Sequence, residues 1–98
     1  MIAQLRELRE EIEKASEDTN INLEEMSNQV HTKWEEIRKV WSVIVLHQEL
    51  DVISVSLISM QSNIKTSEYN RALEEIDRAI FLLEDIVEKE RFALRNIL

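Results

Sequence analysis

The chain contains no glycine and no proline among its 98 residues. These two residues supply the special backbone angles of the tight turns on which β-hairpins and short α/β connections depend. A sheet-containing fold is hard to build without them, whereas long helices joined by short polar links need neither. Charged residues make up 33% of the chain and aromatic residues 5%, a composition that suits solvated helices. The sequence therefore predicts an all-α antiparallel helical bundle, with residues 1–98 as a single domain.

Apolar residues recur at spacings of three and four along three stretches of the chain, about 2–17, 23–65 and 67–97. This spacing gathers them on one face of a helix. Polar residues separate the stretches, and the second separation is so short that the chain must reverse its direction at once. The sequence thus predicts three long helices, each packed antiparallel against the one before it.

Cap residues mark where two of these helices begin. Asn22 belongs to the residue types favoured at N-caps, and Glu25 stands three residues later, as in a capping box. Thr66 or Ser67 can cap the last helix in the same way. We expect the middle helix to begin directly after Asn22.

The apolar stripe of the middle stretch changes its helical phase near His47. One explanation is a continuous helix whose buried stripe moves to another face, which leaves apolar surface for a second protomer and so favours a homodimer. The other is a break near His47 that gives a compact four-helix bundle. Because no glycine, proline or cluster of turn residues stands there, we favour the continuous helix. The β-branched run Val43–Val45 counts against it.

Two tryptophans, Trp34 and Trp41, lie seven residues apart in the middle stretch. A continuous middle helix would be ~60 Å long at ~1.5 Å per residue. The two outer helices, folding back from its opposite ends, would then overlap only near these tryptophans. We predict that Trp34 and Trp41 fill this junction in the core.

The most apolar part of the chain carries three polar residues at its centre, His47, Glu49 and Asp51. His47 and Asp51 are four residues apart and share a helix face, as do His31 and Glu35, so either pair could supply two metal ligands. Zinc normally takes at least three protein ligands, and the chain has no cysteine. We therefore keep His47 and Asp51 only as weak metal candidates. We expect His47 to be a boundary histidine bonded to a neighbouring side chain, and we predict no cofactor.

Several classes of function find no support in the sequence. Loops that cradle phosphate and nucleophile elbows both need glycine. A net charge of −8 argues against nucleic acid, because phosphate binding requires a clustered basic surface. No window reaches the ~18 consecutive apolar residues of a membrane span, and the first residues are too charged for a signal peptide. We predict no catalytic residues.

Several scattered residues resemble a family known only as a "domain of unknown function". They are Trp34, Trp41, the run His47-Gln-Glu-Leu-Asp51, Ile53, Ser56-Leu57, Ile64 and the end FLLEDIVEKERFALRNIL, so the resemblance covers about Leu23 to Leu98. The family comprises short proteins of Gram-positive spore-forming bacteria with an N-terminal hydrophobic anchor and a helical domain. The resemblance implies a domain tethered at the outer face of the membrane, without established activity. It also implies that residues 1–98 are the soluble part of a longer anchored protein.

The sequence as a whole favours a non-enzymatic helical interaction or structural module. Its partner would be another protein or a second copy of the chain, and it would meet a membrane only through the implied anchor. Trp34, Trp41, His47, Glu49 and Asp51 are the residues we expect at the core junction or the interaction site. The alternative is a domain that binds a metal or a small molecule at the corner formed by His47, Glu49 and Asp51.

Overall fold

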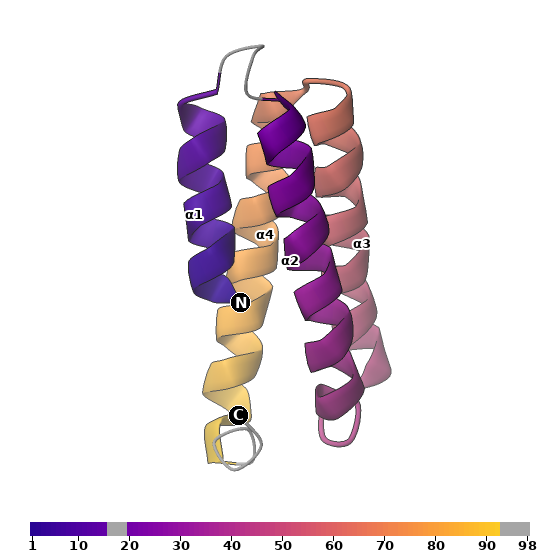
Figure 1. The fold of residues 1–98 in the computed structure, drawn as a ribbon. Coiled ribbons are helices and arrows are strands. Elements are labelled where there is room, and N and C mark those ends of the chain that lie inside the picture. Colours follow the sequence, from indigo (N-terminus) through magenta and orange to yellow (C-terminus); the bar gives the residue numbers. More distant parts are fainter. Residues whose placement is uncertain (16–19, 93–98) are drawn as a thin grey trace.

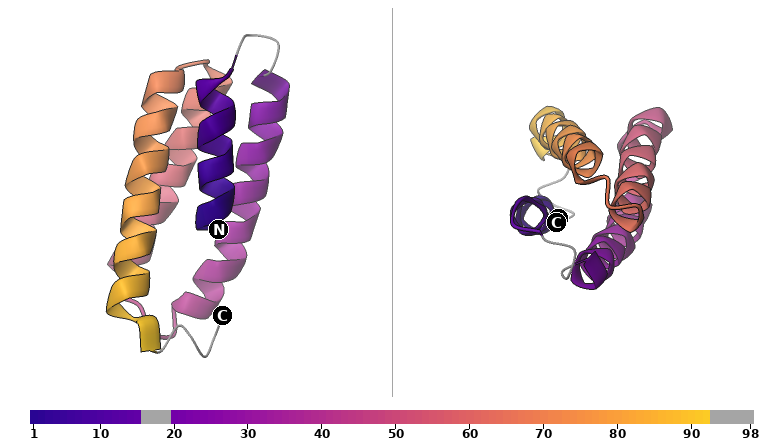
Figure 2. Two further views of the ribbon diagram at one scale, coloured as in Figure 1. Left: turned by 90° about the vertical axis from the view of Figure 1, so that its left-hand side faces the viewer. Right: turned by 90° about the horizontal axis from the view of Figure 1, so that it is seen from above.

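A computed structural model describes residues 1–15 and 20–92, with the backbone alone for residues 20 and 21. Its helices are α1 (Ile2–Glu13), α2 (Asn20–Trp41), α3 (His47–Lys65) and α4 (Tyr69–Lys89). They run alternately up and down, and each packs against two neighbours in the cyclic order α1, α2, α3, α4 (Figures 1 and 2). The described residues contain no strand. The predicted all-α antiparallel bundle is confirmed.

The break near His47 is the alternative that the chain adopts, and the continuous middle helix is wrong. The α2 helix ends at Trp41, and α3 begins at His47 after an extended Leu46 with φ −59° and ψ 138°. The Val45 N–H still donates to the Trp41 carbonyl at 2.9 Å, so the chain leaves α2 through one last turn before it reverses. The bundle measures 42 × 21 × 19 Å, because the two halves of the predicted long helix lie side by side.

The phase change explains why a chain without turn residues reverses at this point. A straight helix would leave one of the two apolar stripes facing water, at a cost that grows with the exposed apolar area. Folding the helix back on itself turns both stripes inward. Trp34 and Trp41 from α2 are then buried in the same core as Leu50, Ile53 and Leu57 from α3.

The helix termini differ from the predicted ones at several positions. The α2 helix begins at Asn20, so Asn22 lies inside it and the predicted cap at Asn22 is wrong. Asn22 Nδ2 instead lies 3.8 Å from Met26 Sδ. The α1 helix ends at Glu13, earlier than predicted. Residues 16–17 of the first predicted helix and 93–97 of the last lie outside the described residues.

The link between α3 and α4 closes without a side-chain cap on α4. Ser67 has φ 59°, the left-handed conformation that glycine usually supplies at this place. The Glu68 N–H donates to the Asn63 carbonyl at 2.8 Å, and the Ser67 N–H donates to the Ile64 carbonyl at 3.1 Å. This is the hydrogen-bond pattern of a Schellman motif. Neither Thr66 nor Ser67 is the N-cap residue, which is Glu68.

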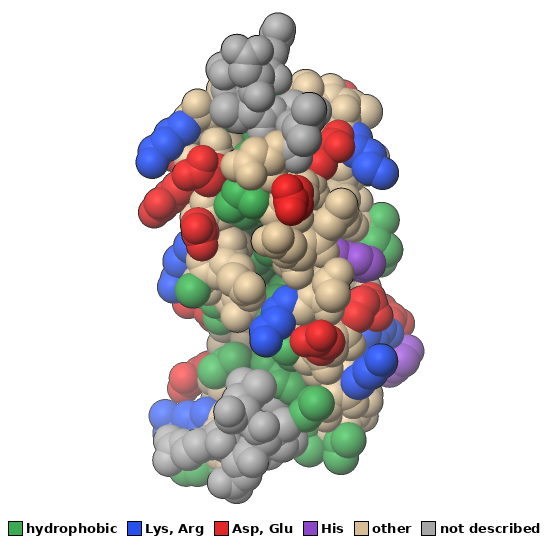
Figure 3. Space-filling view, viewed as in Figure 1, with side chains coloured by type: hydrophobic (Ala, Val, Ile, Leu, Met, Phe, Trp, Pro, Cys, Tyr) green, Lys and Arg blue, Asp and Glu red, His purple; other side chains and the backbone are tan. Residues whose placement is uncertain are grey.

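The α1 helix has 12 residues, whereas α2 has 22 and α4 has 21. It therefore covers only the upper half of the bundle, and the chain start lies at mid-height in Figure 1. Below it a hollow of about 400 Å³ opens between α2 and α4. Its lining is Met1, Ile2, Ala3, Lys33, Ile37, Trp41, Leu83 and Val87. In Figure 3 hydrophobic side chains show in this lower region, whereas charged ones are scattered over the rest of the face.

Within the described residues, no helix combines the length and the apolar character that crossing a membrane would demand.

Candidate interaction sites at the α2–α3 corner and on α3

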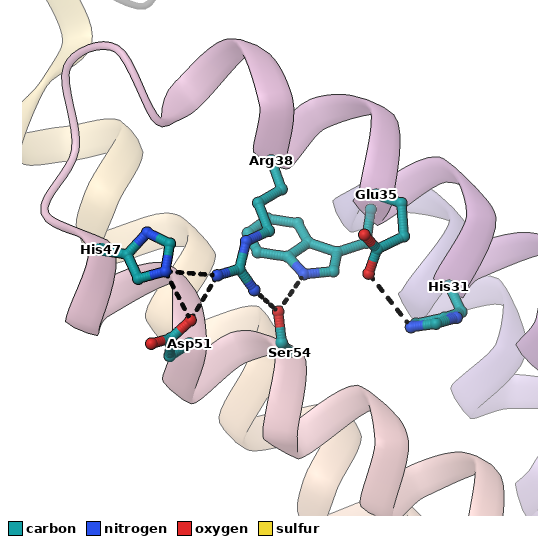
Figure 4. Close-up of polar contacts among 7 residues, drawn as sticks. His31, Glu35, Arg38, His47, Asp51 and Ser54 are labelled. Atoms are coloured by element: carbon teal, nitrogen blue, oxygen red, sulfur yellow. Dashed lines mark hydrogen bonds and ion pairs between the residues drawn. The ribbon is translucent and has the colours of Figure 1, made fainter.

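A cluster of polar side chains joins α2 to α3 beside the core (Figure 4). Arg38 of α2 reaches across to α3, where its guanidinium donates to Asp51 Oδ1 and to Ser54 Oγ. Its Nη2 also lies 3.2 Å from His47 Nε2. Ser54 Oγ accepts a second hydrogen bond, at 2.8 Å, from Trp34 Nε1. One arginine thus connects three residues of α3, and Ser54 ties it to the buried indole.

The Arg38 guanidinium limits the ability of His47 and Asp51 to bind a metal ion. A guanidinium has donors and no acceptor, and one guanidinium nitrogen of Arg38 lies against both His47 Nε2 and Asp51 Oδ1. Asp51 Oδ1 lies 3.6 Å from the same His47 nitrogen, and the charge of its carboxylate is balanced by Arg38. A metal ion between His47 Nε2 and Asp51 Oδ1 would have to displace Arg38 or lie beside its positive charge. The cluster therefore acts as a clamp between two helices.

The three polar residues predicted to form one corner do not converge. His47 and Asp51 turn toward α2, whereas Glu49 turns toward α4 and pairs with Lys89. The hydrogen bond from Lys89 to Glu49, followed by the attraction of both Glu49 and Asp85, raises the pKa of Lys89 above its ordinary value of 10.5. Within the described part of the chain, no group of three or more His, Asp or Glu residues could hold a metal ion.

The other predicted histidine lies apart from this cluster. His31 Nε2 is 3.4 Å from Glu35 Oε1 on the same helix, and no dashed line joins either residue to Arg38 in Figure 4. The predicted pairing of His31 with Glu35 on one helix face is therefore present. Among the described residues, no third side chain completes a possible metal site with this pair. The pair forms a surface contact on α2.

Trp34 and Trp41 pack against each other in the core, as an edge-to-face pair. Their ring centroids are 6.1 Å apart and their planes meet at 88°. Both side chains are buried, but only Trp34 bonds through its indole nitrogen. Trp41 Nε1 is buried and has no hydrogen-bond partner among the described residues, and Trp41 also lines the hollow beneath α1. The two tryptophans thus belong to the packing of the bundle, toward the end that the short α1 helix does not reach.

Sequence reasoning missed the outer face of α3. Val52, Val55 and Ile58 are 46, 64 and 56% exposed, and residues 52–64 include no charged side chain. The uncharged residues that are exposed or half-exposed on this face are Gln48, Val52, Val55, Ile58, Ser59 and Ser62, which we call the α3 strip. Asp51, half-exposed and paired with Arg38, borders its first turn. The signal was present in the sequence as the run VISVSLISMQSNI, whose apolar residues occupy two faces of one helix.

Among the described residues, a shorter apolar group is also exposed at the α2–α3 link, where Val40, Val43 and Leu46 are 42, 79 and 69% exposed. Phe81 on α4 is 70% exposed, but Asp77, Glu84 and Asp85 lie within one turn of it. A single exposed apolar residue among charges is ordinary on a soluble protein. A continuous uncharged helix face is unusual in a chain whose residues are 33% charged. The α3 strip is therefore the strongest candidate for an interaction surface.

A family model described as "Domain of unknown function (DUF4363)" matches residues 1–97. No curated protein and no solved structure matches the chain. The match extends over all four helices, so it includes both the Arg38 clamp and the α3 strip.

Proposed function

We propose that this chain, which belongs to the DUF4363 family of domains of unknown function, is a non-enzymatic interaction module that docks on another protein chain through the α3 strip. The observation that carries the proposal is the exposure of Val52, Val55 and Ile58 within a 13-residue segment free of charge. Protein interfaces are depleted of charged residues at their centre, and exposed apolar patches mark binding surfaces.

The opposite face of α3 supports this proposal. It is rigid, because Leu50, Ile53, Leu57, Met60 and Ile64 are all buried in the core. At the start of the helix, Arg38 clamps the polar side chains to α2. A strip on so well-packed a helix needs little ordering on binding, which keeps the entropic cost of docking low.

A photoreactive side chain placed in the strip tests the proposal. Ser62 lies at the end of the strip and is exposed, so replacing it should leave the fold intact; Phe81 on α4 is the matched exposed control. On illumination in the producing cells, position 62 should give a discrete protein adduct, identified by mass spectrometry, and position 81 should not. The adduct should disappear when Val55 is replaced by Glu. Absence of the adduct, or an equal yield from both positions, would contradict the proposal.

We also propose the membrane tether that the family resemblance implies. The resemblance of Trp34, Trp41 and the run His47–Asp51 to that family supports it. Fractionation of cells that express the natural reading frame tests the tether. The protein should sediment with membranes and be released by detergent but not by high salt. Recovery in the soluble fraction would contradict the tether and leave the docking proposal intact.

A further inference from the structure

We infer that the α3 strip docks on a second copy of this chain, with the two α3 helices packed antiparallel about a two-fold axis. The inference rests on the proposed docking function and names its partner. Three observations lead to it: the charge of the chain, the spacing of the residues in the strip, and the order of large and small side chains along it.

The charge of the chain selects the face on which two copies can meet. Each copy carries a net charge of −8, so two copies repel each other over most of their surfaces. The strip contributes no charge between Val52 and Ile64. Contact centred there keeps most charged groups of the two copies apart, and Asp51, which borders the first turn of the strip, is already paired with Arg38. The strip is thus the place where self-association meets the least electrostatic resistance.

The spacing within the strip fits a pair of packed helices. Gln48, Val52, Val55, Ser59 and Ser62 follow one another at intervals of four, three, four and three. This alternation keeps a seam facing a partner helix along its length, as the a and d positions of a coiled coil do. Ile58 flanks the seam near its middle and adds apolar surface.

The order of large and small side chains selects the antiparallel arrangement. Val52 and Val55 occupy the first half of the seam, and Ser59 and Ser62 the second half. An antiparallel two-fold places Val52 opposite the partner's Ser62 and Val55 opposite the partner's Ser59. Each large side chain then meets a small one, which fills space evenly. A parallel pair would set valine on valine and leave gaps between the serines.

The extent of the strip sets the expected strength of the dimer. The strip spans residues 48–62, and fifteen residues at ~1.5 Å each give a contact ~22 Å long and one helix wide. This is smaller than the ~800 Å² per partner of a standard stable interface. We therefore expect a weak dimer, with Kd on the order of 10 μM to 1 mM, and a chain that is monomeric when dilute.

The absence of cysteine from the sequence allows a direct test of the geometry. A single cysteine in place of Ile58, which lies next to the axis, should form disulfide-linked dimers at least ~10-fold faster than one in place of Phe81, because docking raises its effective concentration. A mixture of Val55→Cys and Ser59→Cys chains should form the mixed disulfide faster than either chain alone forms its own. Preference for the two identical disulfides would overturn the antiparallel register.

Sedimentation equilibrium gives an independent measure of association. The average mass should rise with concentration up to ~1 mM, and added salt should strengthen association because it screens the repulsion between copies. Val55→Glu should weaken the dimer at least ~10-fold, since it sets a charge in the seam. Val43→Glu is the matched control in an exposed position of the α2–α3 link and should not weaken it.

Two results together would overturn the inference: a monomer at ~1 mM, and Ile58→Cys chains that cross-link no faster than Phe81→Cys chains. In that case a Ser62 photoadduct with a different protein would still support docking through the strip. Absence of both self-association and adduct would overturn the docking proposal as well.

Discussion

Arg38 holds the corner between α2 and α3 through contacts with three side chains at once. Its guanidinium bonds to Asp51 and Ser54 and contacts His47. Hydrogen bonds between charged partners are stronger than neutral ones, and those of Arg38 lie at the edge of a low-dielectric core. The cluster therefore fixes how α3 sits against α2, directly after the link where the chain reverses.

Removal of the guanidinium should destabilise the bundle. Arg38→Met keeps most of the aliphatic stem but leaves Asp51 without its counter-ion, so urea unfolding should show a loss of about 1–2 kcal/mol. Arg71→Met is the control, because Arg71 is exposed and its ion pair with Glu68 is long, at 3.9 Å. The control should change stability by less than ~0.5 kcal/mol. Equal effects in both variants would show that the clamp contributes nothing beyond a surface contact.

The pair between Lys89 and Glu49 should make stability depend on pH in the alkaline range. Since the pair raises the pKa of Lys89 above 10.5 in the folded state, the folded chain keeps a proton that the unfolded chain has already lost. The stabilisation is thus complete below pH 10.5 and falls as pH rises through the folded-state pKa. The melting temperatures of wild type and Lys89→Gln should therefore converge as the pH rises through this range.

Lys39→Gln serves as the control for this titration, because Lys39 makes no ion pair within the described ranges. The same comparison with wild type, made at each pH, shows what removal of a lysine without an ion pair does to unfolding. A Lys89→Gln curve that stays parallel to wild type would contradict the assignment.

The α3–α4 link shows how a short connection forms without glycine. Ser67 takes the left-handed conformation, with φ 59°, although a side chain there costs about 1 kcal/mol relative to glycine. The link tolerates this cost because it satisfies the last carbonyls of α3, those of Asn63 and Ile64. The position is therefore slightly strained, in an otherwise regular pair of helices.

Ser67→Gly should relieve this strain. Relief of the strain should raise the free energy of unfolding by about 0.5–1 kcal/mol. The greater entropy of glycine in the unfolded chain offsets part of this gain. Ser62→Gly, at an exposed position within α3, is the matched control and should lower stability by roughly 0.5 kcal/mol. Chemical denaturation of both variants at low protein concentration measures the difference. A loss of stability in Ser67→Gly would show that the serine side chain contributes more to the link than its conformation costs.

The helical elements followed from the sequence, but their boundaries did so only in part. Apolar periodicity located the helices because it reflects a local geometry of 3.6 residues per turn. The break at residues 42–46 was harder to predict, since neither glycine nor proline marks it. The phase change and the β-branched run were its only signals. The cap predicted at Asn22 was wrong because α2 already begins at Asn20.

At the scale of the whole molecule, the described residues form a four-helix bundle with a hollow below α1, between α2 and α4. Both tryptophans belong to the core. The three polar residues predicted to form one corner face two different helices. His47 and Asp51 contact α2, and Glu49 contacts α4. This divergence weakens the alternative in which the three residues bind a metal or a small molecule together.

Divalent metal ions should therefore leave the melting temperature unchanged. Arg38 sets a positive charge against both His47 and Asp51, which opposes a second cation there, and Glu49 is turned away. Thermal melts with and without excess Zn²⁺, Mg²⁺ or Ca²⁺ should superimpose. A rise in Tm that His47→Ala abolishes would instead favour the ligand-binding alternative, because binding to the folded state alone raises Tm.

Local chemistry by itself determined that this protein is helical, which stretches form its helices and which residues face inward within each one. These properties depend on the spacing of apolar residues and on the lack of glycine and proline, and both are visible in the sequence. Only the tertiary structure decided that the middle stretch folds back, that Arg38 bonds to His47 and Asp51, and that α3 keeps a second apolar face exposed. These outcomes depend on how many neighbours each helix has, because a helix with two apolar faces can bury one against its own chain and present the other to a partner.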